Sequence, residues 1–137
     1  MSNYECASRT NYFSVTNEEA FESISGKLRS NDGCDVSVWT KTVNGTKKYA
    51  FGTYGEIQYD GTPILDSEEF LVEMQAILPD GEAVVIEEMG HEKLRYLSGV
   101  AYIITKHDND CIDFDTFIRK KVHDMTQNNA YKCELDY

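Results

Sequence analysis

The densest group of chemically capable side chains lies between Glu87 and Glu92. It places one histidine, His91, among three carboxylates, Glu87, Glu88 and Glu92. A histidine beside carboxylates can ligate a divalent cation, or can act as a general base that a carboxylate orients. The spacing does not match the HExxH motif, however, and the segment falls on a predicted turn, where solvated charges are common. We therefore keep Glu88, His91 and Glu92 as an alternative site, and we expect no metal and no cofactor.

Other candidates for catalysis have less support. His107, Asp108 and Asp110 form a second polar cluster, but it lacks the glycine and the glutamate of a calcium-binding loop and reads as a turn. Neither Cys34 nor Cys111 lies in a nucleophile motif. The chain also has no nucleophile elbow, no phosphate-binding loop and no dinucleotide fingerprint. We expect a binding protein rather than an enzyme.

Charge is the strongest compositional signal. The chain carries 24 acidic and 13 basic residues, which gives a net charge of −11. Binding to nucleic acid requires clustered Lys and Arg, whereas the basic residues are scattered apart from Lys47-Lys48 and Arg119-Lys120-Lys121. The acidic surface either keeps the protein soluble by self-repulsion or attracts a basic partner. We expect a protein partner with a basic surface and no direct nucleic-acid binding, and the solubility explanation stays open.

Aromatic residues give a second indication of binding. Several fall in predicted strands between residues 35 and 60, and some must face outward because side chains alternate along a strand. Exposed aromatics are enriched at interfaces, although a small domain also needs aromatics in its core. The candidate binding residues are three of these aromatics and three carboxylates of a predicted helix: Trp39, Tyr54, Tyr59, Glu68, Glu69 and Glu73.

The elements that hold these residues follow from periodicity. Ala83 to Thr105 reads as a central hairpin of two strands with a turn at Met89 to Glu92. In that register Val84 lies opposite Leu97 and Ile86 opposite Arg95. The other predicted strands cover residues 11–15, 35–43, 47–53, 56–60 and 111–112.

Helix signals complete the pattern. A capping box at Thr16 starts a first helix, Asp66 and Ser67 start a second, and Asp113 caps a third. Between the predicted strands 35–43 and 47–53, Asn44-Gly45 indicates a tight hairpin turn because both residues tolerate positive φ.

Together these elements predict an α+β fold. We expect one two-layer domain, with a mostly antiparallel, twisted sheet of about five to seven strands and about three helices on one face. The domain spans residues 11–126, between an N-terminal tail at 1–10 and a disordered C-terminal tail at 127–137. With no apolar run of ~20 residues and no signal peptide, we expect no membrane association and a cytoplasmic location.

Three short segments are distinctive: residues 9–13 with Val15, residues 19–21, and residues 90–96 with Gly99. They resemble small uncharacterised proteins carried on bacterial plasmids and other mobile elements. The resemblance implies a bacterial accessory protein among host-defence or anti-restriction cargo, some of which mimics DNA with acidic surfaces. It carries no functional residue.

These observations lead to two functional hypotheses. The first is a non-enzymatic, acidic protein-binding domain that acts as an inhibitor, an immunity-type protein or an anti-defence, DNA-mimic-like factor. The alternative is a small enzyme or metal-dependent binder that uses Glu88, His91 and Glu92. The sequence leaves the oligomeric state open.

Overall fold

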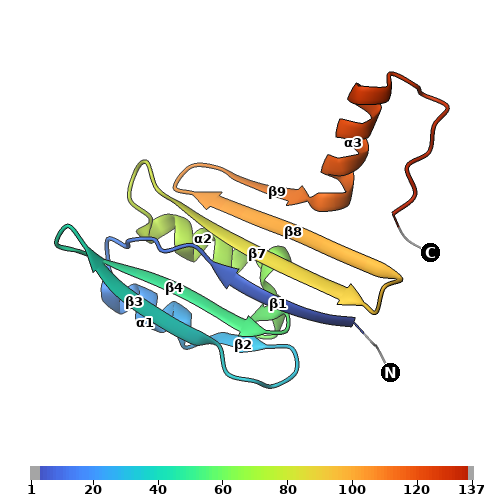
Figure 1. The fold of residues 1–137 in the computed structure, drawn as a ribbon. Helices are drawn as coiled ribbons and strands as arrows, with labels where there is room; N and C mark the ends of the chain where they lie inside the picture. The colour runs from blue at the N-terminus through green and yellow to red at the C-terminus, as the bar shows by residue number, and fades with distance from the viewer. Residues whose placement is uncertain (1–3, 136–137) are drawn as a thin grey trace.

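The computed structural model describes residues 4–135, which contain three α-helices and nine strands and confirm the α+β class. Six strands form one sheet in the order β3-β4-β1-β7-β8-β9, in which every neighbouring pair is antiparallel (Figure 1). We call this the main sheet. Its strands are β1 (Tyr4–Thr10), β3 (Ser37–Val43), β4 (Thr46–Tyr54), β7 (Ala83–Glu92), β8 (Tyr96–Thr105) and β9 (Asn109–Asp113).

The remaining elements are shorter strands and helices. A small second sheet contains β2 (Leu28–Ser30), β5 (Ile57–Tyr59) and β6 (Thr62–Pro63). The helices are α1 (Glu18–Ser25), α2 (Glu68–Ile77) and α3 (Phe114–Thr126), with a single 3₁₀ turn, η1 (Ile64–Asp66), before α2.

The hydrophobic core lies between the main sheet and helices α1 and α2. Phe51 of β4 packs edge-on against Phe70 of α2, with ring centroids 6.3 Å apart, and Phe13 packs in the same way against Phe21 of α1 at 5.6 Å. These four rings are essentially inaccessible to solvent. The arrangement confirms that helices cover one face of the sheet, although only α1 and α2 do so.

Local signals placed several boundaries correctly. Asn44 (φ 51°) and Gly45 (φ 80°) both adopt positive φ between paired residues Val43 and Thr46, as the predicted hairpin turn requires. Ser67 caps α2 by accepting a hydrogen bond from the Phe70 amide at 3.1 Å. The first helix begins one residue later than predicted, because Asn17 rather than Thr16 provides its N-cap.

The predicted N-terminal tail forms β1 instead, the third strand of the main sheet. Its inward positions are polar, so it lacks the apolar alternation by which a strand is recognised. Ser8 Oγ donates to the carbonyl of Gly55 at 2.8 Å, and Thr10 Oγ1 accepts from the Phe51 amide at 3.0 Å. These hydrogen bonds allow both residues to be buried. The strand predicted at 11–15 contains only an isolated bridge between Phe13 and Tyr49.

The predicted register of the central hairpin is wrong. The turn covers residues 93–95, where Lys93 has φ 51°, and both strands extend further than expected. Val84 pairs with Ile104, and Ile86 with Tyr102. This register places four large buried residues on the core side, whereas the predicted register would have set a charged arginine opposite Ile86.

Helix α3 does not join the layer formed by α1 and α2. It begins at the Asp113 cap as predicted, with Asp113 Oδ1 accepting from the Thr116 amide at 3.1 Å. From there it projects away from the edge of the main sheet (Figure 1).

The segment after α3 was predicted to be a disordered tail. Residues 127–135 contain neither helix nor strand, but Arg119 Nε of α3 donates to the carbonyl of Cys133 at 3.2 Å. Residues 1–3 and 136–137, the ends of the two predicted tails, lie outside the described residues.

Candidate functional site

The main sheet has a second face, directed away from α1 and α2. Along β7, Val84 and Ile86 point into the core, so Val85, Glu87 and Met89 point to the opposite side. We call this surface the open face. Within residues 4–135 no helix lies across it, and only the start of α3 contacts it.

Large apolar side chains are exposed on the open face. Tyr54, at the end of β4, is 83% exposed, and Met89, near the centre of the sheet, is 52% exposed. In the register of the sheet both residues lie beside Ala7 of β1, so they flank one small residue. The exposed apolar residues of this face come from five different strands: Trp39, Tyr54, Met89, Leu97 and Ile112.

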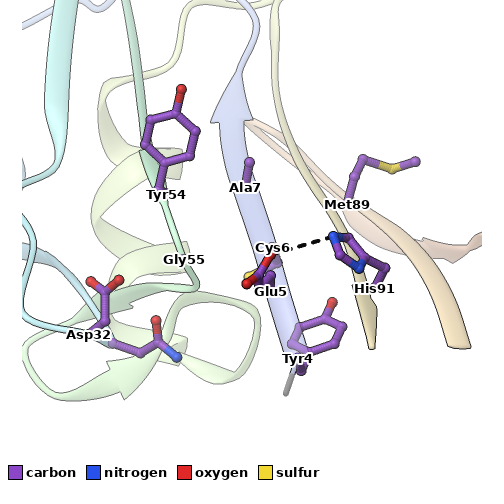
Figure 2. A pocket seen from close by; sticks show the side chains of 10 residues that line it. Tyr4, Glu5, Cys6, Ala7, Asp32, Tyr54, Gly55, Met89 and His91 are labelled. Carbon is purple, nitrogen blue, oxygen red and sulfur yellow. Dashed lines mark ion pairs between the residues drawn. The ribbon is translucent and has the colours of Figure 1, made fainter. Parts of the chain in front are cut away.

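One groove on this face, of about 530 Å³, lies where β1 extends past the end of β4. Figure 2 shows Glu5, Tyr54, Met89 and His91 around it, with Asp32 on the far side. Nε2 of His91 lies 3.6 Å from Oε2 of Glu5, and both side chains are at least half exposed. Such an exposed pair contributes little to stability. We call this hollow the His91 groove.

Two further grooves continue from it across the sheet. The central groove, of about 470 Å³, is lined by Arg9, Trp39, Tyr54, Glu87 and Met89 among others. There the Arg9 guanidinium lies 5.3 Å from the centre of the Trp39 ring, as in a cation–π contact. Met89 lines both of these grooves.

The third hollow, which we call the α3 groove, has a volume of about 340 Å³ and an almost entirely apolar lining. It is bounded by Met89, Ala101 and Ile112 of the sheet and by Phe114 and Phe117 of α3. Because Met89 lines all three grooves, they form one connected surface.

The alternative site predicted around His91 does not assemble. Glu88 and Glu92 alternate with His91 along β7, so their side chains lie on the other face of the sheet. Burial, followed by repulsion from Glu56, raises the pKa of Glu88. Among residues 4–135 no group of His, Cys, Asp and Glu side chains has the geometry of a metal site.

The cysteines are poorly suited to nucleophilic chemistry. Burial, followed by repulsion from Glu88, raises the pKa of Cys6 to about 11. A hydrogen bond with Asp32 raises the pKa of Cys34, and burial raises that of Cys111. These three thiols therefore stay protonated at neutral pH, whereas a cysteine nucleophile reacts as the thiolate.

The predicted binding residues fall on two sides of the molecule. Trp39 and Tyr54 lie on the open face and line the central groove. Tyr59 is buried in the core, where its hydroxyl donates to Glu73. Glu69 pairs with Lys27 at 3.1 Å. These carboxylates belong to α2, which covers the other face of the sheet.

Glu68, the remaining predicted residue of α2, is exposed. The sequence reasoning missed Met89, Leu97, Phe114 and Phe117 as surface residues. If the hairpin turn had been placed at residues 93–95, the alternation of side chains along each strand would have put Met89 and Leu97 on the same face of the sheet. No equivalent signal shows that Phe114 and Phe117 are exposed, because a helix with this pattern normally packs on its own sheet.

Comparison of the chain with models of known protein families, with curated proteins and with solved structures found no match. Within the described part of the chain, no helix has the length and apolar character needed to cross a membrane.

Proposed function

We propose that this chain is a non-enzymatic protein-binding domain and that the open face is its contact surface. The observation that carries the proposal is the group of five exposed apolar residues on a sheet face without a covering layer. Exposed large apolar side chains gathered on one uncovered sheet face mark interaction sites. Aromatic residues and methionine, of which Trp39, Tyr54 and Met89 are examples, are enriched in interface cores.

The acidic charge has a separate role in this proposal. Exposed carboxylates on α1 and α2, such as Glu19 and Glu68, lie on the far side of the sheet from the open face. Charges at the rim of an interface, rather than on the opposite face, accelerate association with an oppositely charged partner more than they slow dissociation. The carboxylates that border the open-face grooves, Glu5, Asp35 and Glu87, would therefore steer a partner with a basic surface toward the apolar side chains.

Two observations favour binding over catalysis. The carboxylates Glu88 and Glu92 do not face His91, and the pKa values of Cys6, Cys34 and Cys111 are raised. The open face offers broad, shallow grooves with mostly apolar linings, whereas an enzyme gathers several polar groups in a closed pocket.

The test compares capture of partner proteins by three versions of the chain. The open-face variant carries Tyr54→Glu and Met89→Glu, which place two charges in the connected grooves. The control carries Val72→Glu, a change at a 60% exposed apolar residue of α2 on the opposite side. We expect a stoichiometric partner to bind the wild type and the control but not the open-face variant.

Two further results make this test decisive. Circular dichroism must show that all three versions are folded, because the substituted side chains are exposed in each. Equal capture by the open-face variant and the wild type, or loss of capture only with Val72→Glu, would contradict the proposal.

A further inference from the structure

Helix α3 is locally well formed, but only its start contacts the sheet, and residues 128–133 lie along the side that carries Arg119 and Val122. Asp113 caps its N-terminus, and Gln127, with φ 51°, ends it by donating its amide to the carbonyl of His123 at 2.8 Å. Its apolar residues recur at helical spacing, yet none of the thirteen described residues of α3 is buried. An isolated helix of this length is marginal in water, so its stability must come from another surface. The apolar stripe consists of Phe114, Phe117, Ile118, Val122 and Met125.

The chain's own sheet cannot supply that surface in this arrangement. Asp113 is both the last residue of β9 and the N-cap of α3, so no residue remains to form a turn between them. Phe114 and Phe117 reach the α3 groove, but Met125 at the far end of the helix is 75% exposed. Figure 1 shows the helix leaving the sheet edge rather than lying over it.

The open face has dimensions that suit such a helix. At 1.5 Å per residue, α3 is about 20 Å long. The four strands β9, β8, β7 and β1 are consecutive in the sheet, and at about 4.8 Å per spacing they cover about 14 Å. A helix of this length can therefore cross all four and reach the central groove.

Charge is also complementary between the two surfaces. Although the chain has a net charge of −11, α3 carries three consecutive basic residues, of which Lys121, four residues from both Phe117 and Met125, lies on the side of the apolar stripe. The central groove contains the carboxylates of Glu87 and Asp35, together with one cation, Arg9, over Trp39. The most basic helix of the chain thus fits an open face that includes carboxylates.

We propose that two copies of this chain form a dimer in which α3 of each copy packs across the open face of the other. This inference rests on the proposed function, because it names a second copy as an occupant of the open face. Each copy has one α3 and one open face. Two-fold symmetry therefore lets each helix pack on the open face of the other copy, and no further chain can be added. A helix joined to its sheet by a very short connection is well placed for such an exchange.

The apolar area is sufficient for a stable dimer. Eight large apolar residues of the open face and α3 are between 41 and 83% exposed. With about 200 Å² per large side chain, they expose on the order of 900 Å² together. A stable interface buries about 800 Å² on each partner. The eight residues are Trp39, Tyr54, Met89, Leu97, Ile112, Phe114, Phe117 and Met125.

Sedimentation equilibrium of the full chain over a concentration series tests the proposal. We expect the wild type to reach twice the mass of one chain. The stripe variant, Phe117→Glu with Met125→Glu, should stay monomeric because it places two charges in the apolar contact. The control, Thr116→Glu with Thr126→Glu, adds the same charge on the polar side of α3 and should remain dimeric.

Fluorescence gives a second, independent measurement. Trp39 is the only tryptophan of the chain and lies on the open face. Its emission should shift to shorter wavelength as the wild type and the control associate, and should stay constant with concentration in the stripe variant. Far-UV circular dichroism checks that each variant is folded, which is expected because the substituted residues lie outside the core.

The outcomes separate this inference from the proposed function. The proposed dimer is contradicted if the wild type is monomeric at every concentration. It is also contradicted if the stripe variant still forms a dimer. If the wild type is monomeric but the open-face variant, Tyr54→Glu with Met89→Glu, no longer captures the partner, the dimer is contradicted and the proposed function is supported. If those two substitutions change neither capture nor mass, the open face is not a binding surface and both proposals fail.

Discussion

Met89 lies directly opposite Gly99 in the β7–β8 pair, and its side chain occupies the space that a larger residue at Gly99 would need. A Cβ atom at Gly99 would lie 2.9 Å from Met89 Sδ and 3.2 Å from Cβ of Phe114. The glycine therefore leaves room for the Met89 side chain and lets the start of α3 approach the sheet.

Replacing Gly99 with alanine should disturb the open face more than the fold. The flexible Met89 side chain can move away, so we expect the free energy of unfolding to change by no more than about 1 kcal/mol. Phe114 must shift as well, which should weaken dimer formation in sedimentation experiments. Adding Met89→Ala to Gly99→Ala relieves the contact with Met89 but not the one with Phe114, so association should stay weak. Unaltered association of the single variant would show that this contact does not position α3.

The N-caps of α2 and α3 should respond differently to truncation. Ser67→Ala removes the hydrogen bond to the Phe70 amide beside the core, so it should lower the global free energy of unfolding by about 1 kcal/mol. Asp113→Ala removes the matching bond to the Thr116 amide in a helix outside the core. It should mainly reduce hydrogen-exchange protection in α3 and weaken the dimer. If both changes lowered the global free energy of unfolding of the monomer by the same amount, the expected difference between α2 and α3 would be contradicted.

Local sequence signals were sufficient wherever neighbouring residues decide the structure. The turn at Asn44-Gly45 and the caps at Ser67 and Asp113 depend on backbone conformation and on hydrogen bonds within four residues. Strand β1 could not be recognised in this way, because Ser8 and Thr10 are buried by hydrogen bonds to residues more than forty positions away.

The candidate site was harder to predict than the fold. Because Met89 and His91 were assigned to a turn, the side-to-side alternation of a strand was not applied to them. That alternation places Met89 and His91 on the open face and Glu88 on the opposite face. Of the aromatic residues, Trp39 and Tyr54 are exposed and Tyr59 is buried, a difference that depends on where α2 packs. Only the three-dimensional arrangement shows that α3 leaves the sheet.

Removal of the His91 imidazole tests the alternative function. The ion pair with Glu5 is exposed, so His91→Ala should change the free energy of unfolding by less than about 0.5 kcal/mol. Metal content, measured by mass spectrometry of the purified protein, should be the same for the variant and the wild type. Loss of a stoichiometric metal ion in the variant would favour the metal-dependent alternative over the binding domain.

Glu88 should make the stability of the protein depend on pH. Burial, with repulsion from Glu56, raises its pKa above the ordinary value, although a hydrogen bond from Tyr4 opposes the shift. The folded protein therefore binds this proton more tightly than the unfolded chain does. The resulting stabilisation is fully present below the ordinary glutamate pKa of about 4.3 and is lost as the pH rises through the pKa of the folded state.

Glu88→Gln should consequently stabilise the protein at pH 7, because the uncharged amide avoids the cost of placing a carboxylate in this half-buried position. The advantage over the wild type should shrink as the pH falls toward 4, where the wild-type carboxyl is itself protonated. Urea unfolding at several pH values measures the difference. The matched control is Glu87→Gln, one residue earlier on the exposed open face. A Glu88→Gln variant that is less stable than the wild type at pH 7 would show that the carboxylate is favourably paired rather than penalised by burial.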